Sequence, residues 1–291
     1  MTTPEKTDYH VHYFVDGCVD DEMTPAAIAR EAERLGLEEI CVLKHYSHEL
    51  PNGEAAWVHW KRIAPAQFER FLDEMRPFRS ASGGPVTVLA GVETELLDET
   101  GEVNIPEAQA AQLDALILSV HWLPRMAAAQ ADPALVPGGL GGSPPEAVSE
   151  WRAAVAKCGA AVLVEGMVAG YVNAMGRNTK VKVLAHMYDG LKPLRDYGVP
   201  VDELDDNVLL PLMEPLMRAC AEGGVLWELM AEPVQRPAVL ARANELGVRF
   251  TATADAHFLR PDGWASLCDH HKAEEYIASL GLTRGRMGRD A

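Results

Sequence analysis

The chain has 291 residues, 48% of them hydrophobic, which is enough for one α/β barrel with a buried core and predicts a single domain over residues 1–291. With 26 basic and 43 acidic residues, its formal net charge is −17. A chain this acidic repels a phosphate backbone, so we expect no nucleic-acid partner. The same charge suits a protein that binds divalent cations.

The five cysteines are widely spaced and form no C-x-x-C pair, which argues against a disulfide framework and against a zinc ribbon. The N-terminal residues form no apolar signal sequence, and no stretch has the roughly 18 apolar residues of a membrane span. We therefore expect a cytoplasmic protein with no membrane partner. The sequence makes no prediction about the oligomeric state.

Short runs rich in Val, Ile and Leu alternate with longer helical patterns along the chain. The first helix is expected to begin with Thr24 as its N-cap and Pro25 at its first position, and to end near Gly36. Strands are expected at 8–12, 39–45, 86–93, 114–121, 181–186, 225–229 and 248–255. The later helices are expected at 67–78, 151–158, 208–224, 237–247 and 273–282, with a Gly/Pro-rich connection at 131–145. This alternation predicts βαβ units in a closed or nearly closed parallel barrel.

Six of the seven expected strands end on side chains that can bind a metal ion. In parallel α/β barrels the C-terminal strand ends meet at one face, so these side chains are directed to one place. Residues two apart on a strand face the same side, about 6.6 Å apart, so two imidazoles can reach one ion at about 2.0–2.1 Å. The residues are His10, His12, His45, Glu93, His121, His186, Asp255 and His257.

Imidazole combined with carboxylate suits zinc, manganese or iron better than calcium. The number of ligands exceeds the four of one tetrahedral ion, so we expect two or three divalent ions. Glu95 lies on the same strand face as Glu93. Glu93 is favoured as the metal ligand because it directly follows Gly91-Val92. Glu228 is either a further member of the site or a partner inside the barrel. The remaining histidines, His48, His59, His270 and His271, are expected to be solvated or to lie behind the ligands.

These motifs occur in an order that resembles the polymerase-and-histidinol-phosphatase (PHP) superfamily, over nearly the whole chain. Ser-Val-His after an apolar strand is most similar to its histidinol-phosphatase branch. The matching segments are Asp8-Tyr9-His10-Val11-His12, Lys44-His45, Gly91-Val92-Glu93, Ser119-Val120-His121, Leu184-Ala185-His186 and Ala254-Asp255-Ala256-His257.

The resemblance implies a distorted (β/α)7 TIM-like barrel with up to three metals. Carried over position by position, it implies that His10, His12, Glu93 and Asp255 hold the first metal. It further implies that Glu93 bridges to a second metal held by His121 and His186, and that His45 and His257 hold a third.

Two positions depart from the family pattern. Histidinol phosphatases usually carry another His shortly after the H-x-H, and this chain has none there. Asp16 is the expected substitute ligand, ahead of Cys18 and Asp20. The residue before His45 is usually acidic in the family and here is Lys44, a cation that either binds an anionic group of the substrate or weakens the third metal by repulsion.

The resemblance implies hydrolysis of a small, anionic phosphomonoester similar to histidinol phosphate, by a hydroxide that bridges two metals. Arg125 and Arg260 follow His121 and His257 closely and are expected to clamp the substrate, ahead of Arg177, Lys180 and Arg236. Asp8 is expected to orient a ligand imidazole, because ligating histidines usually donate their other N–H to a carboxylate or carbonyl.

The same metals could instead serve attack on a carbonyl, which makes a hydrolase of an amide, lactone or cyclic ester the alternative. Lys44 and a group of tryptophans (Trp57, Trp60 and Trp122) leave room for such a substrate. An exonuclease-like activity is disfavoured by the net charge of −17. A non-enzymatic role is disfavoured because almost every ligand position of the family is retained.

Overall fold

The computed structural model describes residues 6–16, 18–46, 65–79, 84–121, 123–126, 149, 153, 157–263 and 265–287. Some expectations concern residues outside these ranges: His48, His59, the three tryptophans, the connection at 131–145 and most of the expected helix at 151–158. None of the helices in the described ranges combines the length and the apolar character that a bilayer span requires.

Seven parallel strands form one sheet in which each strand pairs with the next along the chain. The sheet curls into a nearly closed barrel because β1 also bonds to the segment after β7. The backbone N of His12 donates to the carbonyl of Ala256, and the N of Ala256 donates to that of His10, both at 2.8 Å. The distorted (β/α)7 TIM-like barrel is therefore confirmed. The strands are β1 (Thr7–His12), β2 (Glu39–Tyr46), β3 (Thr87–Glu95), β4 (Ala115–Ser119), β5 (Val181–Leu184), β6 (Leu226–Leu229) and β7 (Phe250–Ala252).

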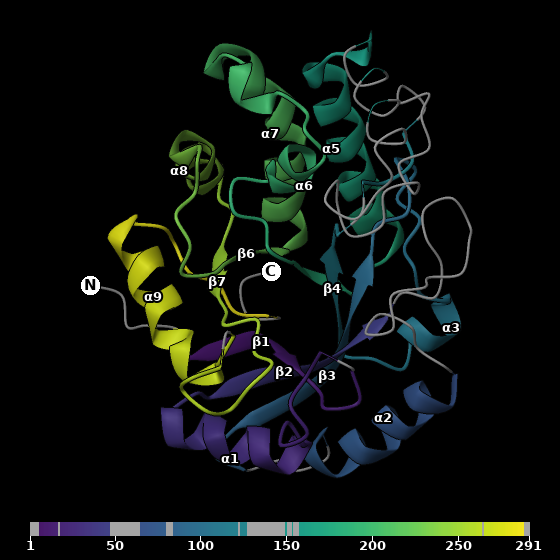
Figure 1. Ribbon diagram of the computed structural model, residues 1–291, viewed down its shortest axis with the longest axis vertical. Helices are drawn as coiled ribbons and strands as arrows, with labels where there is room; N and C mark the ends of the chain where they lie inside the picture. Colours follow the sequence, from purple (N-terminus) through teal and green to yellow (C-terminus); the bar gives the residue numbers. More distant parts are fainter. Residues whose placement is uncertain are drawn as a thin grey trace.

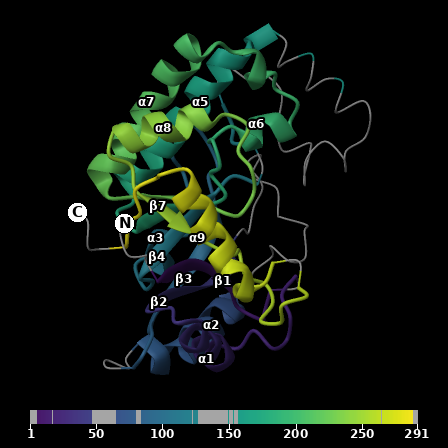
Figure 2. The same ribbon diagram turned by 90° about the vertical axis from the view of Figure 1, so that its left-hand side faces the viewer.

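Helices surround the barrel (Figure 1), and α1 and α2 lie on the side of β1 to β3 whereas α5, α7 and α8 pack together on the opposite side (Figure 2). The α-helices are α1 (Pro25–Leu35), α2 (Pro65–Arg79), α3 (Glu107–Ala110), α5 (Ala160–Arg177), α6 (Lys192–Asp196), α7 (Asp206–Gly223), α8 (Pro237–Glu245) and α9 (His270–Ser279). Two 3-10 turns, η3 (Val201–Glu203) and η4 (Leu267–Asp269), lie in the connections.

The expected cap of α1 is confirmed: the Thr24 hydroxyl accepts from the backbone N of Ala27 at 3.3 Å, and Gly36 ends the helix with φ 75°. The longest helix that the sequence pattern did not predict is α5. Its apolar residues are spread around the helix rather than gathered on one stripe, so its helical period is weak. Strands β4, β5 and β7 also end earlier than expected, so that His121, His186 and Asp255 lie in the connections that follow them.

A small apolar cluster fills the barrel below the strand ends. It comprises Tyr9, Cys41, Leu43, Ala115, Ile117, Val183, Ala185 and Leu226. Gly91 leaves room for this packing, because a Cβ there would lie 2.7 Å from Sγ of Cys41 and 2.9 Å from the carbonyl oxygen of Ala115. This cluster is called the barrel floor, and the polar side chains at the strand ends lie directly above it.

Candidate metal centre

Eight of the nine predicted metal ligands, all except Asp16, come together at the C-terminal end of the barrel. The first four lie within or at the ends of β1, β2 and β3, and the others follow β4, β5 and β7. Five of them are at most 5% exposed: His10, His12, His45, Glu93 and His257. The side chains of His121, His186 and Asp255 are 28%, 20% and 14% exposed and form the open side of the group.

Glu93 occupies the middle of this group, with each carboxylate oxygen facing a different set of imidazoles. Its two oxygens therefore suit a ligand shared between ions. Oε2 lies 3.6 Å from Nε2 of His10, 3.6 Å from that of His12 and 3.0 Å from that of His45. Oε1 lies 3.3 Å from Nε2 of His121 and 3.6 Å from that of His186.

Asp255 faces the same centre from the other side of the barrel. Its Oδ1 lies 3.2 Å from Nε2 of both His10 and His12, and its Oδ2 lies 3.8 Å from Nε2 of His186. Asp255 and His186 both have a positive φ, 46° and 45°, which non-glycine residues rarely adopt. Backbone strain of this kind collects at functional sites, where it serves to aim a side chain.

Four groups of three side chains in the described ranges have ligand atoms close enough to hold one ion. The four groups overlap, because His10, His12, His186 and Glu93 each belong to two of them. The groups are His10, His12 and Glu93; His10, His186 and Asp255; Glu93, His121 and His186; and His12, His45 and His257.

The polar atoms of the centre fit bound cations. Within the described part of the chain, Oε1 of Glu93, Oδ1 of Asp255 and Nδ1 of His12 are buried and have no hydrogen-bond partner. Nε2 of His10 and Nε2 of His12 face each other at 3.0 Å. Because an unsatisfied buried carboxylate is costly, this arrangement is one that a shared positive ion would stabilise.

The electrostatics of the centre favour positive charge. Burial lowers the pKa of His10, but the carboxylates of Glu228 and Asp255 raise it more, so the net pKa lies well above its ordinary value. Burial also lowers the pKa of His45, and Glu93 and Asp16 reverse this in the same way. Burial raises the pKa of Glu93, yet the neighbouring imidazoles bring it well below its ordinary value. The cavity therefore stabilises positive charge at His10 and His45, whereas burial lowers the pKa of His186 and that of His257 below the ordinary value.

Two glutamates outside the predicted ligand set contact predicted ligand imidazoles: Glu228, for which the sequence left a place in the site open, and Glu95, which was ranked behind Glu93. Oε2 of Glu228 lies 2.9 Å from Nδ1 of His10, and its Oε1 accepts from the backbone N of His186 at 3.1 Å. Glu95 lies 2.6 Å from Nδ1 of His121 and accepts from the backbone N of the same residue at 2.9 Å. A carboxylate can accept there when Nδ1 carries the proton, which leaves Nε2 free to face the cavity. The signal in the sequence that could have identified this role is the strand position of Glu95 and Glu228, from which their side chains face into the barrel.

Asp8 has a different role from the one expected. Its Oδ1 accepts from the backbone N of His10 at 3.0 Å, and its Oδ2 accepts from the backbone N of Ala254 at 3.1 Å. The imidazole that it contacts is that of His270, at 3.1 Å from Nδ1, and His270 belongs to none of the four metal groups. Asp8 thus ties β1 to the segment after β7 and does not orient a predicted ligand imidazole.

Asp16 and Lys44 also depart from expectation, because they bind each other. Nζ of Lys44 donates to Oδ1 of Asp16 at 2.7 Å, and Oδ2 of Asp16 accepts from the backbone N of His45 at 2.8 Å. Asp16 belongs to none of the four metal groups. Lys44 is 1% exposed and lines none of the cavities described below, so it cannot contact a substrate there.

The two arginines expected to clamp the substrate point elsewhere. Arg125 pairs with Asp98 at 3.4 Å and with Glu102 at 3.6 Å. Arg260 pairs with Asp20 at 2.7 Å, and Asp20, a weaker candidate for the substitute ligand, belongs to none of the four metal groups. Local sequence distance placed both arginines near the ligands, but carboxylates on neighbouring loops hold their guanidinium groups. The weaker candidates also have structural partners: Arg177 bonds to Thr100, Lys180 to the carbonyl of Leu113, and Arg236 to Asp206.

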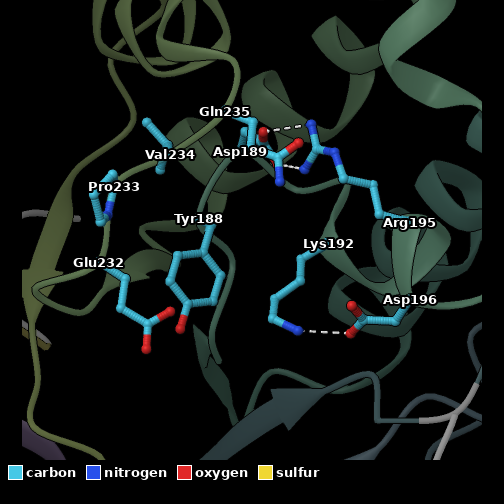
Figure 3. Close-up of a pocket in the computed structure, with 9 residues that line it drawn as sticks. All are labelled: Tyr188, Asp189, Lys192, Arg195, Asp196, Glu232, Pro233, Val234 and Gln235. Carbon is cyan, nitrogen blue, oxygen red and sulfur yellow. Dashed lines mark hydrogen bonds and ion pairs between the residues drawn. The ribbon is translucent and has the colours of Figure 1, made fainter. Parts of the chain in front are cut away.

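A cavity of about 290 Å³ opens onto the centre, and Cys18 lines it together with the ligands. It shares His121, His186 and Asp255 with a neighbouring cavity of about 310 Å³, which extends to Tyr188, Lys192, Met230 and Glu232. A third cavity of about 160 Å³ continues from there past the Asp189–Arg195 ion pair (Figure 3). The three cavities share lining residues in turn, so the candidate metal centre lies at one end of a row of adjoining cavities, which is called the groove here.

No protein-family model matches the chain. A probable phosphatase of Caldanaerobacter subterraneus subsp. tengcongensis is 30% identical over 115 residues, which are 39% of this chain and 38% of that protein. The chain thus matches about two fifths of that relative's length. A probable phosphatase of Vibrio vulnificus is 24% identical over 284 residues, which are 97% of this chain and 88% of that protein.

Two solved structures share the fold. The histidinol phosphate phosphatase of Lactococcus lactis subsp. lactis, in complex with zinc, L-histidinol and phosphate, has a TM-score of 0.55 at 17% identity, over 97% of this chain and 96% of that one. A protein of Listeria monocytogenes named as a histidinol phosphatase has a TM-score of 0.57 at 14% identity, over 89% of this chain and 97% of that one. These matches agree with the resemblance drawn from the sequence motifs, and the chain shares the fold of the two solved structures.

Proposed function

We propose that this protein is a divalent-metal-dependent phosphomonoesterase that acts on a small phosphate ester such as histidinol phosphate. The observation that carries the proposal is the buried centre around Glu93, in which five imidazole Nε2 atoms lie 3.0–3.6 Å from its two carboxylate oxygens. Similarity to proteins named as phosphatases supports the choice of a phosphate ester over a carbonyl compound.

The four overlapping groups would hold two or three ions, and their imidazole and carboxylate donors suit zinc, manganese or iron. Bound divalent ions would supply an activated water near neutral pH and neutralise charge on the phosphoryl oxygens. Glu93 would be shared between neighbouring ions. His10, His12 and Asp255 would bind on one side of it, and His121 and His186 on the other.

The supporting carboxylates set the protonation state of the ligands. Glu228 would hold the proton of His10 at Nδ1, and Glu95 would do the same for His121, so that both Nε2 atoms present lone pairs to the cavity. Asp8 would keep the backbone of His10 next to the segment that carries Asp255. These contacts orient the ligands before any ion or substrate binds.

The groove gives the substrate its direction. The phosphoryl group would lie against His121, His186 and Asp255, where the two inner cavities join, and the alcohol part would extend toward Tyr188 and Glu232. Lys192 is a cation on this path. Its Nζ lies 2.6 Å from Asp196, and both side chains are about half exposed, so a phosphoryl oxygen can compete for the ammonium group (Figure 3).

The test is phosphate release from a panel of small phosphomonoesters, including histidinol phosphate, with chelator-treated protein and after addition of Zn²⁺, Mn²⁺ or Fe²⁺. We expect release only after metal addition, and loss of that release in His12→Ala and Asp255→Ala. His271→Ala is the matched control, because His271 is exposed and contacts the Cys268 carbonyl. Full turnover by metal-stripped His12→Ala protein, or turnover of carboxylic esters with no phosphate released from any ester, would sink the proposal.

A further inference from the structure

The Asp16 carboxylate is used almost completely within the protein. Oδ2 accepts from the backbone N of His45 at 2.8 Å and lies 2.9 Å from its Nδ1, and Oδ1 accepts from Nζ of Lys44 at 2.7 Å. A carboxylate offers about four acceptor positions, and three are taken here. Nδ1 of His12, at 3.7 Å, is too far for a hydrogen bond. Asp16 therefore has little capacity left to coordinate an ion.

Lys44 and His45 reach Asp16 from opposite sides of β2. Along this strand Cys41 and Leu43 face the apolar floor inside the barrel, whereas Val42 and Tyr46 face the helices. By this alternation His45 points inward and Lys44 outward. The loop after β1 brings Asp16 over the end of the strand, where it contacts both. Lys44 thus acts on the metal centre through Asp16 and not through the substrate cavity.

Because Lys44 and Asp16 are both buried, their ion pair affects the charge that a metal ion would meet. The side chains of Lys44 and Asp16 are each 1% exposed, so solvent screens their charges little. A buried carboxylate without a counter-charge attracts any cation nearby, and here the counter-charge is already built in. The Asp16 negative charge is therefore largely cancelled before a metal ion arrives.

The four candidate metal groups consequently differ in charge. Three of them contain the carboxylate of Glu93 or Asp255, whereas the group of His12, His45 and His257 contains imidazoles alone. Glu93 lies 3.0 Å from Nε2 of His45, and Oδ1 of Asp255 lies 3.2 Å from Nε2 of His12, but both carboxylates belong to other groups. Asp16 belongs to none of the four groups and could add its negative charge to the imidazole-only group. Its carboxylate is instead paired with Lys44.

We propose that Lys44 is an internal counter-cation that holds Asp16 as the orienting partner of His45, and that it thereby makes the His12–His45–His257 group the weak, exchangeable metal position of the centre. This inference rests on the proposed metal-dependent function. It assigns Lys44 a positioning role in metal occupancy and none in substrate contact. The centre is then filled in steps, with the carboxylate-containing groups occupied first.

The test is a titration of chelator-treated full-length protein with Zn²⁺, followed by calorimetry and by elemental analysis after equilibrium dialysis. In the unmodified protein we expect tight binding events and one weaker event, which His45→Ala removes without affecting the tight ones. Lys44→Met should tighten the weak event at least about tenfold, because the Asp16 charge is no longer cancelled. The double variant Lys44→Met/Asp16→Asn should lose this gain.

The matched control is Lys180→Met, which removes a partly buried lysine from the opposite end of the barrel and should leave all binding events unchanged. Lys44→Gln serves if Lys44→Met does not fold, since it also removes the charge. Unchanged or weaker metal binding in a folded Lys44 variant, or loss of a tight event in His45→Ala, overturns the inference. Absence of any Zn²⁺ binding by the unmodified protein would instead refute the proposed function.

Discussion

The Glu228 carboxylate lies 2.9 Å from Nδ1 of His10, and both side chains are completely buried. The same carboxylate accepts from the backbone N of His186, so one residue of β6 contacts a predicted ligand on β1 and another in the connection after β5. This contact joins residues 218 positions apart in the sequence.

Glu228→Gln should weaken metal binding by about 10–100-fold, the usual effect of removing the group behind a ligating histidine. The amide keeps the volume but loses the charge that holds the Nδ1 proton of His10. Zn²⁺ titration of chelator-treated protein measures this. Glu222→Gln, at an exposed position of α7, is the control and should bind metal normally. Equal affinity in both variants would contradict an orienting role for Glu228.

Metal affinity should increase as the pH rises above 6.5. The neighbouring carboxylates raise the pKa of His10 and His45 well above this ordinary value, so in the metal-free protein both imidazoles still hold protons there. An ion must displace those protons, and this cost disappears once the pH exceeds the raised pKa values. Burial lowers the pKa of His257 to about 3, so this residue adds no such cost. The measurement is the dissociation constant at several pH values between 6 and 9, and a flat profile would refute the prediction.

Lys192→Gln should raise KM for a phosphomonoester roughly tenfold with a smaller change in kcat, because a hydrogen bond to a charged group contributes about 1.5 kcal/mol or more. Steady-state kinetics and inhibition by inorganic phosphate measure the effect. Lys182→Gln is the control on β5.

Arg125→Ala and Arg260→Ala should change kcat/KM by no more than about threefold, since their pairs with Asp98 and Asp20 are partly exposed. A larger loss in either arginine variant than in Lys192→Gln would return the anion-binding role to that arginine.

Gly91→Ala should lower the free energy of unfolding by about 1–3 kcal/mol, because its Cβ would lie within 3 Å of three neighbours in the barrel floor. Urea unfolding of the metal-free protein measures the loss. Gly176→Ala is the matched control in α5, where a Cβ meets nothing within 4 Å and alanine is the better helix former. A Gly91 variant as stable as the Gly176 variant would mean that the floor adapts freely.

Local sequence patterns were sufficient to predict most residues of the candidate site. Strand periodicity and the position of a polar residue at each strand end are local patterns, and a parallel barrel brings such ends to one face. His10, His12, His45, Glu93, His121, His186, Asp255 and His257 were therefore placed together from the sequence. The helix α5 was missed because its apolar residues do not form the narrow stripe that reveals a helix.

The connections between these residues depended on the tertiary structure. Contacts across the barrel decide that Glu228, and not Asp8, lies behind the imidazole of His10, and that Lys44 binds Asp16. Contacts between loops decide where Arg125 and Arg260 point. A hydrogen bond or ion pair needs its two atoms within about 3–4 Å, and sequence spacing does not specify such distances between separate elements. The sequence by itself determined which side chains meet at the end of the barrel, and the fold decided which of them face the cavity and which hold the others in place.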